Sequence, residues 1–287
     1  MRKHTAGLLS LLIVTIVWST TFPVAKAAFD HLSPALLTAC RFAISALLVA
    51  PRLLGLSRAE AQLGTVLGLL QFLCVAAVFI GMESSGAGRS AFLISLSVFM
   101  VPLANVLRGK RMGWVQLAAA AIALIGVALF TGAAFGGFTR GDWWIIGSAV
   151  MFTAYMLIIE AAGAQESPVR QSAVQLLIVA VLAFAWLAWE GLPVSVMAAV
   201  RPVWIHVVYL GICAILTTNL QVWGQQYVSA HEAALIFILE PVLATVWSYW
   251  FLGETLSAMA LPGAALILGA NLWSQFAQGK DYNGKST

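Results

Sequence analysis

The stretch ALIFILEPVLATVWSYW, residues 234–250, contains a single charged side chain among residues that suit lipid or a protein core. That side chain is Glu240, and Pro241 follows it directly. Proline has no amide hydrogen, so the carbonyl of Phe237 loses its helical partner and the helix is expected to bend. A carboxylate within so apolar a helix is costly in lipid and usually faces a cavity lined by protein. The stretch therefore predicts a membrane helix that is bent beside a polar site.

The composition of the whole chain agrees with a membrane protein. Of its 287 residues 61% are hydrophobic and 9% are charged, and the mean hydropathy is +0.94. Soluble domains carry about 25% charged residues, so this chain cannot cover a surface that faces water. The net charge of +4 would suggest nucleic acid binding in a soluble protein. Here basic residues in cytoplasmic loops are the better explanation.

The apolar segments divide the chain into ten predicted membrane spans. A bilayer core about 30 Å thick requires about 20 helical residues for each crossing. The predicted spans are residues 5–28, 33–54, 61–81, 88–107, 113–132, 142–162, 168–189, 203–224, 230–251 and 256–277. The connections between them are short, which leaves no room for a separate soluble domain. Although Ala25-Lys26-Ala27 resembles a signal-peptide cleavage site, we predict that the first span is retained.

The distribution of lysine and arginine predicts the orientation. With the N-terminus in the cytoplasm, ten of these residues lie inside and four outside, while Arg41 falls within the second span. Because cytoplasmic loops carry the excess of basic residues, both termini are predicted to be cytoplasmic.

The two halves of the chain resemble each other. Residues 90–130 align without gaps on residues 233–273 at an offset of 143, and Ser33-Pro34 aligns on Ser167-Pro168 at an offset of 134. Each half holds five spans, an odd number, so the second copy must enter the membrane inverted. We therefore predict an all-α membrane protein of two inverted five-helix repeats, residues 1–136 and 137–277, followed by a tail at 278–287.

Two aligned pairs reverse their charge in a way that the positive-inside rule does not predict. Arg89 aligns with Glu232, and Lys26 aligns with Glu160. Ion pairs between the two halves are our interpretation of these reversals.

The sequence carries none of the common motifs of enzymes or metal sites. It has no GxxxxGK[ST], GxSxG or GxGxxG pattern, and its four histidines and three cysteines lack metal-ligand spacing. We therefore predict no ATP-driven pump, no enzyme, no metal and no cofactor. A membrane enzyme that acts on lipid would need an interfacial cluster of His, Asp or Ser, and the sequence shows none. No nucleic acid and no obligate protein partner are expected.

Four segments together resemble the EamA-type branch of the drug/metabolite transporter superfamily. They are WSTTFPVAKAAF (18–29), SVFMVPLANVL (97–107), ILEPVLATVWSYWFLGETLS (238–257) and GAALILGANL (263–272). The resemblance covers essentially the whole chain. It implies ten helices in a bacterial inner membrane and export of amino acids or related metabolites. The general appearance and high tryptophan content resemble the aromatic amino acid exporters in particular.

One position departs from the family pattern. The Gly-Glu that usually closes the fourth span of the first copy reads Lys110-Arg111 here. If that carboxylate normally braces the first half, another contact must replace it.

Polar and aromatic residues at depth supply the candidate site. In the span 203–224 and the residues that follow, Asn219, Trp223 and Gln226 share one helical face, while Gln221 and Gln225 share a second. We predict that the first face lines the cavity; bonds between helices are the alternative for these amides. The predicted substrate-binding residues are Trp18, Gln71, Phe79, Met82, Ser95, Phe99, Tyr155, Asn219, Trp223, Gln226, Phe237 and Glu240, with helix bends at Pro23, Pro102 and Pro241.

The resulting hypothesis is a secondary exporter that works by alternating access. Its substrates would be aromatic and other neutral amino acids, with broad specificity. The alternatives are cationic drugs or small metabolites such as nucleotide sugars. Arg41 is predicted to extend to the external interface rather than to bind a substrate carboxylate. Glu240 is the only deep carboxylate, which makes it the candidate proton carrier if transport is coupled to protons.

Overall fold

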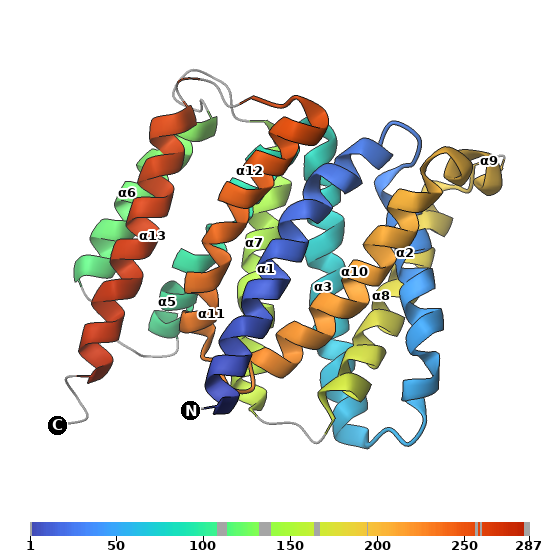
Figure 1. Ribbon diagram of the computed structural model, residues 1–287, viewed down its shortest axis with the longest axis horizontal. Coiled ribbons are helices and arrows are strands. Elements are labelled where there is room, and N and C mark those ends of the chain that lie inside the picture. The colour runs from blue at the N-terminus through green and yellow to red at the C-terminus, as the bar shows by residue number, and fades with distance from the viewer. Residues whose placement is uncertain are drawn as a thin grey trace.

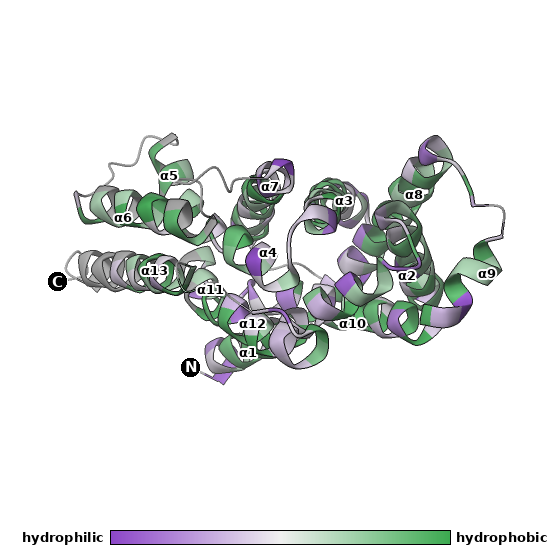
Figure 2. Cartoon of the chain, turned by 90° about the horizontal axis from the view of Figure 1, so that it is seen from above, coloured by the Kyte–Doolittle hydropathy of each residue, from purple (hydrophilic) through white to green (hydrophobic). Residues whose placement is uncertain are grey.

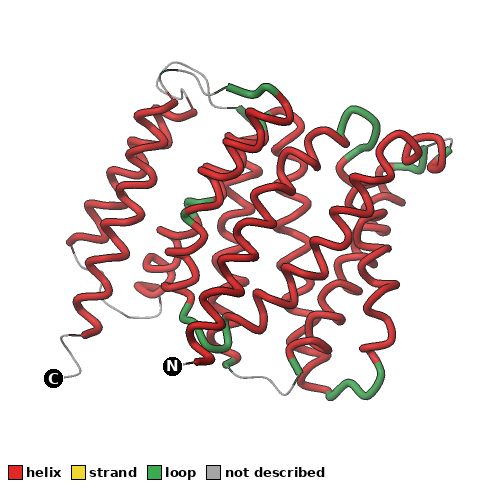
Figure 3. The backbone as a smooth tube through the Cα atoms, viewed as in Figure 1, coloured by secondary structure: helices red, strands yellow, loops and turns green. Residues whose placement is uncertain are grey.

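The chain is seen in a computed structural model that describes residues 2–107, 114–131, 139–163, 167–193, 195–255, 258 and 260–283. These residues form helices and short connections, with no strand among them (Figure 3). The helices are α1 (Arg2–Ala28), α2 (Pro34–Val49), η1 (Ala50–Leu53), α3 (Arg58–Ser84), α4 (Ala87–Ile94), α5 (Ser97–Leu107), α6 (Trp114–Thr131), α7 (Arg140–Ala162), α8 (Pro168–Glu190), α9 (Val196–Val200), η3 (Arg201–Val203), α10 (Trp204–Gly224), α11 (Ala230–Phe237), α12 (Leu239–Leu252) and α13 (Ala260–Asn283).

The described helices are those of an integral membrane protein. Seven helical segments are long and apolar enough to cross a bilayer, and two shorter apolar segments cover Ala87–Val101 and Ala260–Ala270. Leu47, Trp189 and Trp250 illustrate the outer surface, where large apolar side chains lie exposed as a lipid-facing surface requires. Apolar residues therefore cover both the inside and the outside of the bundle.

Two predicted spans are each built from two shorter helices. α4 ends at Ile94 and α5 begins at Ser97, while α11 ends at Phe237 and α12 begins at Leu239 (Figure 3). The breaks are equivalent in the repeat alignment, because Ser95 and Ile238 differ by 143. Both interruptions leave backbone groups near the middle of the bundle outside regular helix.

The prolines behave differently at the three predicted bends. Pro241 occupies the third position of α12, within the first turn, where a missing amide hydrogen costs no helical bond. The predicted bend at Pro241 is thus a break just before it. Pro102 lies inside α5, several residues after the break that precedes that helix. α1 runs through Pro23 without interruption.

Local capping explains where several helices begin. Ser33 accepts a hydrogen bond from the amide of Leu36 at 3.3 Å, and Ser167 accepts one from Arg170 at the same distance. In both cases a proline at the first helical position follows the serine, a common way to start a helix. The two caps are equivalent in the repeat alignment.

From above, the central helices form two facing rows (Figure 2). In one row α3 packs against α7 and α8, and in the other α1 packs against α10 and α12. α6 and α13 pair at one end of the bundle, and α2 packs on α8 and α10 at the other. α1 aligns with α7 and α3 with α10 in the repeat, so the contacts α1–α10 and α3–α7 are equivalent.

Glycine pairs at matching positions allow these two helix contacts to be close. A Cβ added to Gly7 of α1 would lie 3.1 Å from the carbonyl oxygen of Gly224 of α10. A Cβ added to Gly81 of α3 would lie 2.7 Å from the carbonyl oxygen of Gly141 of α7. Gly7 and Gly141 differ by 134, while Gly81 and Gly224 differ by 143, so both repeat offsets recur in the packing.

α1 and α7 run in opposite directions. Lys26, near the end of α1, donates from Nζ to the carbonyl of Met82 at 2.6 Å, which places the end of α1 beside the end of α3. Gly141, at the start of α7, also lies beside the end of α3. α1 begins and α13 ends on the same side of the bundle (Figure 1).

Candidate functional site

A central cavity lies between the two rows of helices. Side chains from α1, α2, α3, α4, α5, α7, α10, α11 and α12 line it. The participation of α2 was not predicted. Glu240, which is 7% exposed, reaches the cavity from the first turn of α12.

Most of the predicted site residues lie together in this cavity. Eight of the twelve line it, namely Trp18, Gln71, Phe79, Met82, Ser95, Tyr155, Phe237 and Glu240. They come from both halves of the chain and are far apart in sequence. The structure thus brings together residues that were selected as polar, aromatic or apolar side chains deep in the predicted spans.

Phe99, Asn219, Trp223 and Gln226 are not among the cavity-lining residues. Asn219 Nδ2 donates to the carbonyl of Ile215 at 2.7 Å, and Trp223 packs edge-on against Tyr227. Phe99 packs against buried apolar clusters. These positions differ from the prediction that the Asn219 face of α10 would line the cavity.

The face of α10 that reaches the cavity carries Thr217 and Gln221. Both are 2% exposed. The next residue on this face is Gly224, which packs against Gly7 of α1. A close glycine contact requires its helix face to point inward, but the sequence does not show which glycines make such a contact.

Aromatic rings form one wall of the cavity. The Trp18 ring centroid lies 5.5 Å from that of Phe152 and 5.4 Å from that of Phe237. Phe152 also lies 5.8 Å from Phe237 and 6.3 Å from Tyr155. Phe152 was not among the predicted site residues, although its alignment with Trp18 at an offset of 134 could have identified it. The wall offers a large apolar surface with ring faces and edges.

Several cavity residues occupy equivalent positions of the two halves. Cys74 and Thr217 differ by 143 and both line the cavity. The same is true of Ile94 and Phe237, and of Ser97 and Glu240. The cavity therefore lies where the two halves meet.

Polar groups in and beside the cavity are only partly satisfied within the described residues. Gln71 Nε2 donates to Thr218 Oγ1 at 2.9 Å, but Gln71 Oε1 is buried without a partner. The Tyr155 hydroxyl donates to Gln175 Oε1 at 2.9 Å. No described residue forms an ion pair with the Glu240 carboxylate. Unpaired buried acceptors are available for a bound molecule.

Arg41 corrects a prediction. Instead of extending to the external interface, its side chain is 8% exposed and lines the cavity. The guanidinium carbon lies 4.5 Å from the Phe42 ring centroid and 4.8 Å from that of Phe79. Arg41 is the eighth of sixteen residues of α2, about 10 Å from either end, which explains why the side chain turns inward rather than outward.

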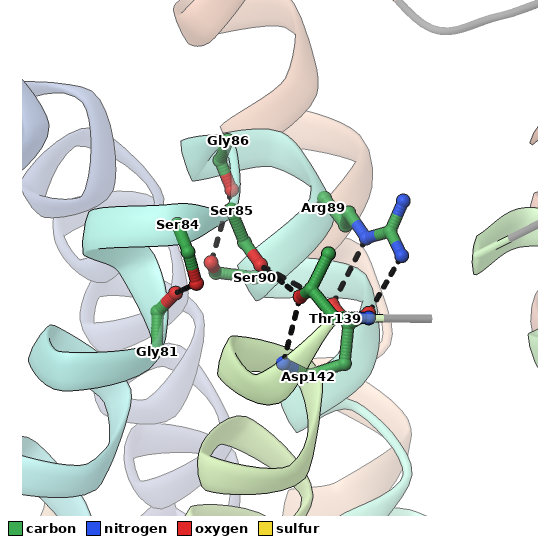
Figure 4. A network of polar contacts seen from close by, with 8 residues as sticks. All are labelled: Gly81, Ser84, Ser85, Gly86, Arg89, Ser90, Thr139 and Asp142. Carbon is green, nitrogen blue, oxygen red and sulfur yellow. Dashed lines mark hydrogen bonds and ion pairs between the residues drawn. The ribbon is translucent and has the colours of Figure 1, made fainter. Parts of the chain in front are cut away.

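Charged residues link the two halves at one end of the bundle (Figure 4). Arg89 Nε donates to Asp142 Oδ1 at 3.0 Å, and Arg89 Nη2 donates to Asp142 Oδ2 at 2.6 Å. Asp142 also accepts from the Ser85 hydroxyl at 3.2 Å and from the Thr139 amide at 2.7 Å. α4 of the first half is therefore held on α7 of the second.

A second link lies at the start of α11. His4 Nε2 and Glu232 Oε1 are 2.9 Å apart, which again joins the two halves. The ion-pair interpretation is therefore confirmed for Arg89, whereas Glu232 contacts the first half through a histidine, which forms an ion pair only when its ring is protonated. Lys26 instead donates to the carbonyls of Met82 and Glu83 within the first half, and no described carboxylate forms an ion pair with it.

The Gly253-Glu254 pair that follows α12 ends one helix and caps another. Gly253 adopts a left-handed conformation with φ of 67°, which ends the helix. The Glu254 carboxylate then accepts from the amides of Ala87 at 3.0 Å and Gly88 at 3.2 Å. It thereby caps the N-terminus of α4 in the other half.

The departure at Lys110-Arg111 lies outside the described residues. The predicted replacement contact therefore stays a prediction, but the start of α11, the counterpart of α4, is described. There Ser229 accepts from the amide of Glu232 at 3.2 Å, and Glu232 accepts from the amide of Ser229 at 3.0 Å. This capping box satisfies the start of α11 without a carboxylate from the first half.

Comparisons with known proteins place the chain in a family. A model of the EamA-like transporter family matches residues 5–132 and again residues 139–274. A probable terminal-alkyne amino-acid exporter of Streptantibioticus cattleyicolor is 26% identical, over 97% of this chain and 96% of its own length. A probable amino-acid metabolite efflux pump of Salmonella typhimurium is 26% identical, over 91% of this chain and 92% of its own.

Two further similarities agree with this placement. A transporter of Archaeoglobus fulgidus whose function is uncharacterized is 27% identical, over 91% of this chain and 82% of its own length. A protein of known crystal structure shares the fold with a TM-score of 0.66 at 20% identity, over 93% of this chain and 96% of its own. Because the family model matches most of the sequence in two consecutive segments, the chain belongs to the EamA-like transporter family.

Proposed function

We propose that this protein is a secondary exporter of neutral amino acids, aromatic ones included, with broad specificity. The observation that carries the proposal is the cavity between the two halves, which combines an aromatic wall with the unpaired carboxylate of Glu240. The names of two relatives, an amino-acid exporter and an amino-acid metabolite efflux pump, support this substrate class.

The membrane arrangement that we propose is a pair of inverted five-helix repeats, residues 1–136 and 137–277. The chain would cross a bacterial inner membrane ten times, with both termini in the cytoplasm. The opposite directions of α1 and α7 support the inversion, as do the equivalent glycine contacts and the two family matches. The substrate would bind at mid-depth, at the interface of the repeats.

Within the cavity, the rings of Trp18, Phe152 and Phe237 would hold an apolar or aromatic side chain by offset and edge-to-face contacts. The Glu240 carboxylate would accept hydrogen bonds from the substrate ammonium. Backbone carbonyls at the break before Pro241 would add acceptors nearby. An aromatic wall tolerates side chains of different size, which suits a broad specificity.

The transport cycle that we propose is alternating access. The two halves would rock about the cavity, so that the links at Arg89–Asp142 and His4–Glu232 open in turn. No ATP is required, because the substrate gradient or a coupled ion supplies the driving force.

Counterflow in proteoliposomes tests the function directly. Purified protein would be reconstituted and loaded with unlabelled phenylalanine, threonine or a quaternary aromatic cation, and uptake of the same labelled compound would be measured. We expect counterflow of phenylalanine and, more weakly, of threonine. Counterflow of the cation alone would instead favour a drug exporter, the second candidate, because Glu240 beside aromatic rings would also suit a cation.

Substitution of Glu240 separates substrate transport from proton coupling. If Glu240 carries the proton as well as contacting the substrate ammonium, Glu240→Gln should weaken counterflow but abolish accumulation driven by a pH gradient. Glu83→Gln is the control, because this carboxyl is more exposed and is not among the cavity-lining residues. Accumulation that is unchanged in Glu240→Gln would exclude Glu240 as the proton carrier.

A further inference from the structure

The guanidinium of Arg41 is the basic group in the described lining of the cavity. It projects from the middle of α2, a helix packed between α8 and α10. The residue is 8% exposed, and its Nε is buried without a hydrogen-bond partner. A buried cation within a membrane helix is costly, and such residues usually take part in function.

Two other described arginines each form an ion pair with a carboxylate, which Arg41 does not. Arg89 is held by Asp142 at 2.6 Å, and Arg170 is held by Glu60 at 3.0 Å. Arg41 lies deeper than either, yet no described carboxylate forms an ion pair with it. Glu240 lines the same cavity but is not paired with Arg41. The positive charge of Arg41 is therefore uncompensated by any described side chain.

Two aromatic rings fix the guanidinium without using its donors. Phe42 and Phe79 contact it through their ring faces, with centroids 4.5 Å and 4.8 Å from the guanidinium carbon. Such contacts stabilise the charge and limit its rotation, but they accept no N–H hydrogen bond in the way a carboxylate does. A guanidinium offers five N–H donors in a planar array, a geometry that matches a carboxylate.

Among the described residues, the second half contributes no cation to the cavity lining. The position equivalent to Arg41, at an offset of 134, is Gln175. Its Oε1 accepts from the Tyr155 hydroxyl at 2.9 Å, and Gln175 does not line the cavity. The cavity therefore has a positive group on the α2 side and a negative one on the α12 side. This asymmetry would orient a dipolar molecule in one direction.

We infer that Arg41 binds the carboxylate of the substrate, while Glu240 faces its ammonium group. This inference rests on the proposed function and narrows its substrate class to molecules that carry a carboxylate beside an ammonium. A bidentate contact between guanidinium and carboxylate provides both charge and geometry, so neutral derivatives of the carboxylate are discriminated against. Arg41 is thus the residue that separates amino acids from amines.

The test compares phenylalanine with phenylalaninamide, which keeps the ring and the ammonium but lacks the carboxylate. Wild-type protein in proteoliposomes should carry phenylalanine at least about 10-fold better than the amide, because the amide leaves the guanidinium without a charged partner. Arg41→Gln should reduce phenylalanine counterflow about 10-fold or more and leave that of the amide unchanged. Arg58→Gln, at an exposed position at the start of α3, is the matched control and should change neither.

A second measurement does not depend on the folding of a variant. Phenylalanine should raise the melting temperature of detergent-solubilised wild-type protein more than the amide does at equal concentration. Equal stabilisation by the two compounds would overturn the inference, as would an unchanged transport ratio in Arg41→Gln. Both of these outcomes leave the proposed function intact, since phenylalanine is still bound or carried. Absence of any phenylalanine counterflow by the wild type would instead refute the proposed function and the inference with it.

Discussion

α4 and α11 begin at equivalent points of the two halves, but their N-termini are stabilised in opposite ways. α4 starts after Gly86, which has no side chain, and the carboxylate of Glu254 reaches across from the other half to cap it. α11 starts after Ser229, the residue equivalent to Gly86, which caps the helix together with Glu232. The start of α4 is therefore capped by a residue of the second half, whereas the start of α11 is capped by its own residues.

The charged contacts near these two helix starts also differ in burial, and the one at α4 is the more buried. Asp142, which pairs with Arg89 of α4, is fully buried. His4 and Glu232 retain 45% and 38% of their side-chain exposure. Buried charges that lose a partner are strongly destabilising, whereas exposed pairs contribute little. The two halves are therefore held firmly where α4 begins and loosely where α11 begins. If the halves rock, we expect the α11 end to open at lower cost.

The largest effect should follow from breaking the firm link. Asp142→Ala removes a carboxylate that accepts bonds from Arg89, Ser85 and Thr139, so it should lower the free energy of unfolding by about 3 kcal/mol or more. Thermal unfolding in detergent measures this loss. Arg89→Ala in the Asp142→Ala background should cost little more, because the pair is already broken. Additive losses would show that the two side chains stabilise the fold independently.

An intermediate effect should follow from removing the cap that crosses between the halves. Glu254→Ala leaves the amides of Ala87 and Gly88 without their acceptor and should cost about 1 kcal/mol. Adding Gly86→Ser to this variant copies the Ser229 cap of α11. A Cβ at Gly86 would lie 3.0 Å from Glu254 Oε2, so the serine fits best once Glu254 is shortened. We expect partial recovery of the melting temperature in the double variant.

The stability of the Gly86→Ser single variant tests whether the two ways of capping α4 exclude each other. In the presence of Glu254 the new side chain is crowded, so it should give no gain in stability. A gain of the same size with and without Glu254 would show that the two ways of capping α4 are not alternatives.

The smallest effect should come from the loose link. His4→Gln removes the pair with Glu232 but leaves the capping box of α11 intact, so the loss should stay below about 1 kcal/mol. The same measurement with Glu232→Gln, which keeps a side chain able to cap, should give a similarly small value. A loss comparable with that of Asp142→Ala would contradict the proposed difference between the two links.

Particular residues show how far the sequence could predict the site. Glu240 was identifiable because one charge in an apolar helix is expensive wherever the helix packs. Trp18, Gln71 and Tyr155 were correctly placed near it by depth and by the repeat offsets. The faces of α10 could not be ranked by amide content, because both faces carry amides and apolar residues suit lipid and core alike.

From the sequence it was possible to predict the apolar helices, a distortion near Pro241, the internal repeat and the buried charge of Glu240. These follow from local chemistry: hydrocarbon excludes charges, proline lacks an amide hydrogen, and a repeat is visible as a constant offset. The tertiary structure alone decided that Gln221 rather than Asn219 reaches the cavity, that Arg41 turns inward between Phe42 and Phe79, and that Glu254 caps the helix at Ala87. Each of these depends on which helix lies opposite, and in a membrane the apolar pattern that marks a buried face in water is absent.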